Sequence, residues 1–446
     1  MTSRFPHPLT LLTGCILAAA LASFVLPAGE YNRRPDPATG RTVVVAGTYH
    51  QVERRPVGPF QALVAIPQGL GEAASVVFLV FLVGGAFTVV DKTGALRQAV
   101  GWLVRRLQSR EALVIPIVSL TFAAGGALEN MGEEIIALVP VLLLVTRQLG
   151  FDAVTAVAIS IGAAAVGAAF SPINPFQAQI AQKLAGLPLL SGGAFRTAVM
   201  GLALAIWIFG TWRHAMRTRR PPEAVSPEAH VHLNGRGLTV LLLVLLTFAM
   251  FLYGVLQLGW DFDQMSALFF AMGILAGLAG GLGVGGTAQA FVAGFADMAY
   301  AAMLVGFARA IFVVLDHGRI IDTVVYGLTV PLQSLPVVVS ALGMEAVQAA
   351  LHGAVPSVSG QAVLTMPVLV PMSDLIGLSR QVTVLAYQYG AGLTEIVTPT
   401  NGALMAVTAA MSVRYDDWLE FVLPLYAALL ALGAVALIIA IAIGLR

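Results

Sequence analysis

The sequence predicts an all-α polytopic membrane protein made of two inverted repeats, each with a re-entrant helical hairpin and a broken transmembrane helix. Two observations carry this prediction. Apolar residues make up 58% of the 446-residue chain and charged residues only 11%, against about 25% charged in ordinary globular proteins. In addition, two stretches of the chain repeat each other at a constant offset of 227 residues, with proline and glycine at the same places.

The repeat rests on five identities in register, with no gap between them. In the first half these residues are Gly126, Pro140, Gly150, Pro172 and Asn174, and in the second half they are Gly353, Pro367, Gly377, Pro399 and Asn401. Paired apolar segments that are interrupted by Pro and Gly at matching places indicate the binding site of a transporter. We therefore expect the two sets of interruptions to meet at one site.

The first expected membrane helix covers residues 8–28. Arg4 followed by an apolar run resembles a signal peptide, but most of that run follows Cys15, whereas a lipoprotein signal has its apolar stretch before the cysteine. We therefore expect a retained helix. A polar segment follows, with a small β-hairpin expected around 42–45, and then a second span over 74–90.

Basic loops set the expected orientation, because Lys and Arg are enriched in cytoplasmic loops. The loop after the second span contains Lys92, Arg97 and Arg110, and residues 213–237 contain five arginines beside Pro221-Pro222. We expect both loops and the N-terminus in the cytoplasm of a bacterial-type inner membrane. The segment 213–237 then links a first membrane repeat, 1–212, to a second, 238–446.

The segment 111–147 is apolar but interrupted, and it has two interpretations. It could form two complete spans joined by a loop with three carboxylates, or a re-entrant hairpin with its polar tip near the midplane. Arg110 and Arg147 lie at its two ends, and a hairpin returns both ends to the same side, which favours the hairpin. Its counterpart in the second repeat is 336–371, with a polar tip at 356–361.

Each expected hairpin is followed by a helix that breaks. The first is 153–185 and the second is 380–413; the breaks contain Pro172, Pro175, Pro399 and Gly402. Proline frees backbone carbonyls, which lipid tolerates only where they line a cavity or are buried in protein.

The number of crossings between the two hairpins predicts the inversion. We expect five, at 153–185, 196–212, 238–258, 264–283 and 298–315. An odd number brings the second hairpin in from the opposite face, although 284–335 is difficult to assign. A last helix is expected over 418–443.

Polar residues at the expected membrane depth form the candidate substrate- and ion-binding site, because ionisable groups are costly there. The set consists of Glu129, Asn130, Glu133, Glu134, Ser171, Asn174, Ser357, Ser359, Gln361, Thr365, Glu395, Thr398, Thr400 and Asn401. Some have simpler explanations. Glu133 or Glu134 could be a first-turn carboxylate favoured by the helix dipole, and Ser171 and Thr398 could bond carbonyls of their own helices.

The charges of this set favour a cationic cargo, coupling cations or protons. Four carboxylates face no arginine or lysine that we can place at the same depth. Lys183, Arg196 and Arg380 lie near span ends, where we expect them to reach the membrane surface. The coupling ion could be Na⁺, held at the helix breaks, or H⁺. No Cys/His/Asp cluster has metal-ligand spacing, so no other metal or cofactor is expected, and no basic run indicates nucleic acid.

Four parts of the chain carry a family resemblance: 27–31, 174–176 with 181–182, 356–367 and 398–400. In these segments the chain resembles the YfcC-type branch of the C4-dicarboxylate carrier (DcuC-like) family, within the ion transporter superfamily. This resemblance implies inverted repeats, a scaffold domain, a homodimer and elevator-type alternating access. It also implies secondary transport of carboxylates or amino acids, often proposed as basic amino acid antiport. Ala391 and Glu395 depart from the family pattern, which often has Asp and Asn there, so that a carboxylate has moved by one helical turn.

The sequence therefore predicts a secondary active transporter for a small organic solute, driven by an ion gradient or by exchange. We rank a basic or zwitterionic amino acid above a C4-dicarboxylate because of the acidic core. The alternative is a passive channel, since broken helices and carbonyl-lined sites also occur in channels. An enzyme is not expected, because we find no Ser/His pair or two-Asp dyad.

Overall fold

The computed structural model describes residues 7–37, 42–95, 111–129, 131–220, 235–258 and 260–445. Within these ranges, eight helices are long and apolar enough to cross a membrane. The protein is therefore an α-helical polytopic membrane protein. Most of the expected linker 213–237, the basic residues of 96–110, and Asn130 lie outside the described residues.

The N-terminal segment forms a helix and two small β-ribbons. Helix α1 covers Pro8–Val25. Strand β1 (Gly29–Glu30) pairs with β4 (His50–Gln51), and β2 (Arg33–Pro35) pairs with β3 (Thr42–Val44), both antiparallel. The expected hairpin around 42–45 is thus the β2–β3 ribbon. It is anchored to the helical body because the Tyr31 amide and the Arg33 guanidinium both donate to the Asp322 carboxylate.

A wall of three helices runs through the molecule. Helices α2 (Pro59–Glu72) and α3 (Ala74–Lys92) follow each other directly, and both pack against the 35-residue helix α13 (Gly283–His317). Glycines allow this close approach, since a Cβ atom on Gly69 would lie 2.6 Å from the Gly306 carbonyl oxygen. The sequence did not predict α2. At 1.5 Å per residue α13 is about 52 Å long, which exceeds the roughly 30 Å hydrocarbon core.

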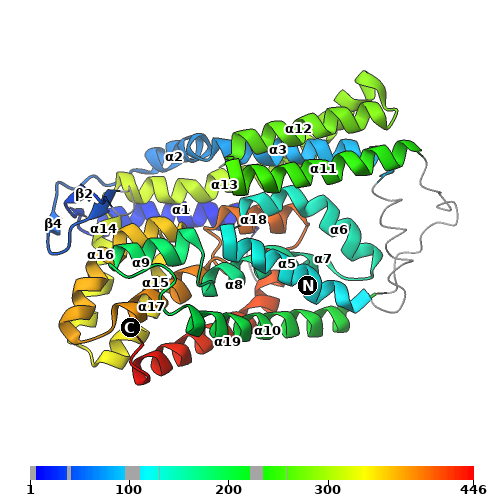
Figure 1. Cartoon of the computed structure of the whole chain (residues 1–446). Coiled ribbons are helices and arrows are strands. Elements are labelled where there is room, and N and C mark those ends of the chain that lie inside the picture. The colour runs from blue at the N-terminus through cyan, green and yellow to red at the C-terminus, as the bar shows by residue number, and fades with distance from the viewer. Residues whose placement is uncertain are drawn as a thin grey trace.

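Helix α12 (Phe262–Ala279) packs on the outer face of this wall, against α3 and α13, and α11 (Gly235–Leu258) packs against α12; most of the other helices lie on the other side of the wall (Figure 1). The glycine-rich stretch 280–286 makes the turn from α12 into α13, with positive φ at Gly281 and Gly283. The helix continues from Gly283, so the stretch that was difficult to assign contains a single long helix up to His317, and α13 begins earlier than the expected crossing at 298.

The segment expected as the first hairpin contains α5 (Val114–Glu129), the 3₁₀ segment η2 (Glu133–Leu138) and α6 (Val139–Gln148). The first broken helix follows as α7 (Ala153–Val157), the π-helical turn η3 (Ala158–Gly162) and α8 (Ala163–Phe170). After the break it resumes as the π-helical turn η4 (Pro175–Gln179) and α9 (Ile180–Leu184), and α10 covers Gly193–Thr218.

The second set has a matching order. It begins with α14 (Ile321–Thr329) and η6 (Val330–Ser334), and continues with α15 (Val337–His352) and α16 (Val358–Ile376). The second broken helix is α17 (Arg380–Thr394) and α18 (Gly402–Ala410), and α19 covers Tyr415–Ala442. The offset of 227 residues carries the first residues of α7 and η4 onto the first residues of α17 and α18.

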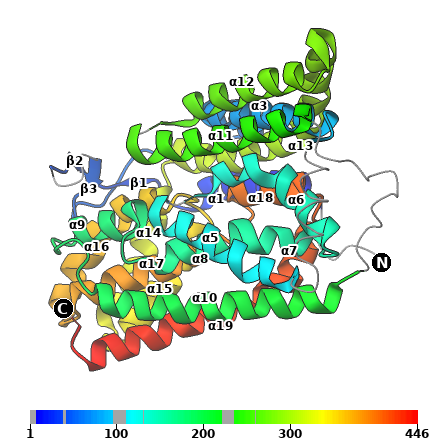
Figure 2. The same ribbon diagram turned by 45° about the vertical axis from the view of Figure 1, so that its right-hand side comes forward.

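Hydrogen bonds between distant segments define the two ends of this helical body. At one end the Arg220 amide donates to the Gly150 carbonyl, just before α7 begins. At the other end the Arg380 guanidinium donates to the Ala185 carbonyl, just after α9 ends. Helix α10 runs between these ends alongside α19 (Figure 2). The outer ends of α5–α6 therefore lie at the first end, and the outer end of α16 lies at the second.

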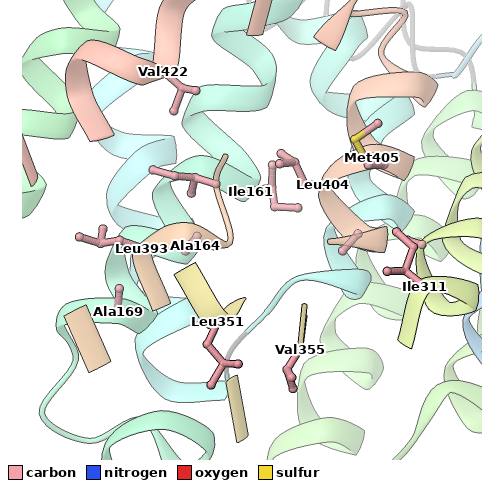
Figure 3. Packing of buried hydrophobic residues seen from close by; sticks show 14 of the residues in the cluster. Ile161, Ala164, Ala169, Ile311, Leu351, Val355, Leu393, Leu404, Met405 and Val422 are labelled. Carbon is pink, nitrogen blue, oxygen red and sulfur yellow. The ribbon is translucent and has the colours of Figure 1, made fainter. Parts of the chain in front are cut away.

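The apolar core lies where the broken helices meet the wall. Figure 3 shows Ile161 of η3, Leu393 of α17 and Leu404 of α18 around the same interior as Ile311 of α13 and Leu351 of α15. The polar side chains of Ser171, Asn174 and Thr398 at the two breaks are buried, whereas Ile173 and Phe176 at the first break are exposed.

Replacing Gly126 with alanine should lower stability strongly, because α5 packs on α8 with backbone against backbone. A Cβ atom on Gly126 would collide with the Ala164 carbonyl oxygen, and one on Gly167 with that of Ala123. Overpacking of this kind costs about 1–3 kcal/mol, and backbone atoms have little freedom to yield. Thermal denaturation in detergent measures the loss. Gly201→Ala on α10 is the matched control, because nothing lies within 4 Å of its Cβ position; equal stability of the two variants would contradict the prediction.

Candidate functional site

A cavity of about 350 Å³ lies between the hairpin tips, the second helix break and the wall formed by α2, α3 and α13. The hairpins and broken helices contribute Met131, Gly132, Glu133, Ile161, Ala165, Ala168, Pro356, Glu395, Ile396, Thr400, Asn401, Gly402, Ala403 and Leu404. The wall contributes Glu72, Ala73, Val76, Val305, Ala308 and Arg309. The cavity is thus lined by segments that are far apart in sequence.

Two carboxylates of the predicted set meet in this cavity. Glu133 is the first residue of η2, and Glu395 is the C-cap of α17; both line the cavity, are half-buried and interact electrostatically with each other. Two negative charges that face one space repel unless a cation or a proton lies between them. The geometry therefore suits a cationic group.

The wall opposite carries an ion pair that the sequence did not predict. Arg309 Nε lies 2.8 Å from Glu72 Oε2, and its guanidinium stacks over the Phe312 ring at 4.8 Å. The prediction that no arginine or lysine lies at the depth of the acidic residues is therefore wrong. The error has a simple origin: α2 was not recognised, and Arg309 is one cation within a long apolar helix.

The second helix break is built around Asn401. Its Oδ1 accepts from the Leu404 amide at 3.2 Å, which caps α18, and its Nδ2 donates to the Glu395 carbonyl at 3.1 Å. The hydroxyls of Thr398 and Thr400 bond each other at 2.8 Å. Thr400, Asn401 and Gly402 line the cavity, so the positive end of the α18 dipole also faces it.

The first helix break does not line the cavity, and its Ser171 and Asn174 side chains are fully buried. Asn174 Oδ1 accepts from the Phe176 and Gln177 amides at 2.9 and 2.8 Å, and its Nδ2 donates to the Gly126 carbonyl at 2.8 Å. Ser171 Oγ donates to a carbonyl of the first hairpin rather than to its own helix, that of Ala127 at 2.9 Å. These two side chains therefore fasten the break to α5.

The polar residues of the second hairpin bond mainly to one another. Gln361 Nε2 donates to the Gln348 carbonyl, and Gln348 Nε2 donates to the Thr365 hydroxyl, both at 2.8 Å. Ser357 caps α16 by accepting from the Gly360 amide, and Ser359 lies half-buried in the first turn of α16. Of the tip segment 356–361, Pro356 alone appears among the cavity-lining residues of the described chain.

Three predicted residues remain at the first hairpin tip. Glu134 Oε2 accepts from the Gly132 amide at 3.0 Å, which orders the turn before η2. The side chain of Glu129 and the whole of Asn130 lie outside the described residues.

The prediction made for Arg196 is wrong. This residue was expected to extend to the membrane surface, but it is only 1% exposed. Its guanidinium donates to the side-chain oxygens of Gln388 and Gln381 on α17. Two glutamines seven residues apart on one face of a helix are the signal that could have indicated a buried donor between α10 and α17. Among the described residues, no group of three or more His, Cys, Asp or Glu side chains could hold a metal ion.

A family model described as C4-dicarboxylate anaerobic carrier (DcuC) matches residues 5–442. The chain belongs to this family. Among curated proteins, "Putative basic amino acid antiporter YfcC" of Escherichia coli (strain K12) is 30% identical over 484 residues, covering 97% of this chain and 96% of that protein. An uncharacterized protein of Haemophilus influenzae (strain ATCC 51907 / DSM 11121 / KW20 / Rd) is 27% identical, covering 99% and 98%. The resemblance to the YfcC-type branch is confirmed.

Two solved structures show weaker likeness to this family member. The YdaH transporter of Alcanivorax borkumensis has 19% identity and a TM-score of 0.46, covering 98% of this chain and 99% of its own. The MtrF efflux pump of Neisseria gonorrhoeae has 18% identity and a TM-score of 0.39, covering 98% and 95%. The family match, rather than these structures, identifies the chain as a multi-pass membrane transporter of a bacterial carrier family.

Proposed function

We propose that this chain is a secondary active transporter that moves a basic or zwitterionic amino acid across the inner membrane by alternating access. One observation carries the proposal: the central cavity holds Glu133 and Glu395 on the hairpin and helix-break side and Arg309, paired with Glu72, on the wall. The name of the relative from Escherichia coli, which refers to a basic amino acid antiporter, supports the same substrate class.

The charges in the cavity suit an amino acid better than a dicarboxylate. An ammonium or guanidinium group can bond to Glu133 and Glu395 through charge-assisted hydrogen bonds. The substrate carboxylate can bind the planar fork of Arg309, near the N-terminus of α18. A C4-dicarboxylate would instead bring two negative charges into a cavity with three carboxylates and one guanidinium.

The arrangement of the two helix sets supports alternating access. The hairpin α5–α6 has its outer ends at one end of the molecule, and α16 has its outer end at the other, as expected for inverted repeats with re-entrant hairpins. The long wall of α2, α3 and α13 would be the fixed scaffold, and the hairpins with the broken helices would be the moving part. The homodimer and the elevator motion implied by the family resemblance belong to this proposal, as does coupling to Na⁺, to H⁺ or to exchange.

Counterflow in proteoliposomes tests the proposal. Vesicles loaded with unlabelled arginine should accumulate labelled arginine or lysine, and the rate should saturate with concentration. The same ligands should raise the denaturation temperature of the purified protein, because a ligand that binds the native state stabilises it. Succinate should do neither. Counterflow of succinate alone would make the chain a dicarboxylate carrier, and a non-saturating flux indifferent to internal substrate, pH and Na⁺ would favour the channel.

A further inference from the structure

Helix α15, the first arm of the second hairpin, carries a buried polar stripe that the cavity does not use. Glu345, Gln348 and His352 are spaced by three and four residues, so they share one face of the helix. Glu345 is 5% exposed, and the other two are fully buried. Gln348 and His352 both bond to Gln361 of α16. Glu345 takes no part in that network.

Glu345 is enclosed by two other helices. Its Oε1 is buried and has no hydrogen-bond partner. A Cβ atom on Gly433 of α19 would collide with this oxygen, so glycine at that position leaves the space in which the carboxyl group lies. Gly433 also packs against Tyr389 of α17, whose hydroxyl is buried and likewise has no partner. The surroundings of the Glu345 carboxyl group are therefore buried and weakly polar.

The described chain forms no ion pair with Glu345. The titratable groups near it are Tyr389 of α17 and Tyr426 of α19, and both are neutral phenols at ordinary pH. Tyr426 shares a hydrogen bond with Thr394.

The charged residues of the neighbouring helices point elsewhere. Asp374 of α16 pairs with Arg380 of α17, and Asp322 of α14 pairs with Arg33. On α19, Asp416 pairs with Arg414, and Glu420 is exposed. Arg196 of α10 interacts electrostatically with Tyr389, and its guanidinium donates hydrogen bonds to glutamines of α17. Among the residues that the structure describes, no positive charge is therefore placed to balance an ionised Glu345.

An ionised carboxylate without a partner in such a place costs several kcal/mol in effective desolvation, whereas a protonated carboxyl group avoids that charge. We propose that Glu345 is a proton-binding site of this chain, separate from the substrate cavity, and that its proton must be bound for α15 to pack against α17 and α19 as it does here. The coupling of this proton to substrate movement rests on the proposed function.

The position of Glu345 connects the binding of this proton to the shape of the cavity. Helix α15 leads directly to Pro356 at the tip of the second hairpin, which lines the cavity. When the O–H bond breaks and the proton leaves to water, a negative charge remains between α15, α17 and α19. This charge opposes their packing and shifts the hairpin toward a conformation in which water reaches Glu345.

The variant Glu345→Gln tests this inference, because glutamine keeps the shape of a protonated carboxyl group and cannot release a proton. In purified protein, infrared difference spectra between acid and alkaline pH should show the carbonyl bands of all carboxyl groups that titrate, and Glu345→Gln should lose one component, that of the buried carboxyl group whose Oε1 has no hydrogen-bond partner. Glu420→Gln, an exposed glutamate of α19, should keep it. This readout needs no transport, so it separates failure of the inference from failure of the proposed function.

Transport gives the second readout. The rate of arginine counterflow by the unmodified chain should vary with pH by up to about tenfold per pH unit, which is the limit for one titrating group. In Glu345→Gln this rate should depend less on pH than in Glu420→Gln. Glu345→Gln should still show the thermal shift that arginine induces. An unchanged infrared band or an unchanged pH profile in Glu345→Gln would overturn the inference. The inference would also be overturned if His352→Asn lost the pH dependence of counterflow while Glu345→Gln kept it.

Discussion

Replacing Glu395 with glutamine is expected to weaken the binding of arginine or lysine by about 10- to 100-fold, because a hydrogen bond to a charged group contributes about 1.5–3 kcal/mol. Glu395 lines the cavity, faces Glu133 and has its backbone carbonyl held by Asn401. Glutamine preserves the volume of the side chain and its place at the end of α17. The loss should therefore appear in binding and transport, with little change in stability.

Concentration-dependent thermal shift and counterflow measure this effect. Glu420→Gln removes a carboxylate of the same size from an exposed position and should bind arginine as the unmodified chain does. Glu133→Gln should resemble Glu395→Gln, since both carboxylates face the same space. Unaltered arginine affinity in Glu395→Gln would remove this residue from the site.

Replacing Asn174 with alanine is expected to destabilise the protein by about 2–4 kcal/mol, the sum of a lost helix cap and an unsatisfied buried carbonyl. Asn174 is fully buried; it caps η4 and donates to Gly126. Alanine removes both the cap on η4 and the hydrogen bond to the Gly126 carbonyl. Transport should fall because the first break loses its attachment to the first hairpin.

Asn401→Ala is the matched comparison, because the two asparagines occupy equivalent positions in the repeat. Asn401 caps α18 but is only half-buried and lines the cavity. We therefore expect Asn401→Ala to lose less thermal stability than Asn174→Ala and to lose arginine binding. The reverse order of stabilities, measured by thermal denaturation, would contradict the assigned roles.

The class of fold follows from sequence because it depends on patterns that any membrane protein must obey. Long apolar runs must be helical in lipid, and proline with asparagine at matched positions indicates interrupted helices. The two breaks do lie where Pro172 and Pro399 indicate them. Asn174 and Asn401 look alike in sequence, however, and only packing decides that the first is sealed against α5 while the second faces a cavity.

The residues that sequence reasoning missed are those whose importance depends on a distant partner. Glu72 belongs to α2, a helix that the sequence did not predict and that contains a proline, Pro67, in its interior. Arg309 becomes meaningful only once α13 lies beside α2. Glu345 is a single acid in an apolar helix, and nothing in its sequence neighbourhood reveals that α17 and α19 enclose it.

The Glu72–Arg309 ion pair has a consequence for selectivity. Under the proposed function, Glu72 compensates the charge of Arg309 through Nε in the unloaded carrier, so chloride or phosphate meets an already paired cation on this wall of the cavity. A substrate carboxylate that binds the terminal nitrogens of Arg309 would share the guanidinium with Glu72, so it would add less to affinity than it would at an unpaired arginine. Discrimination among cargoes would then depend more on the cationic end of the molecule, which meets Glu133 and Glu395.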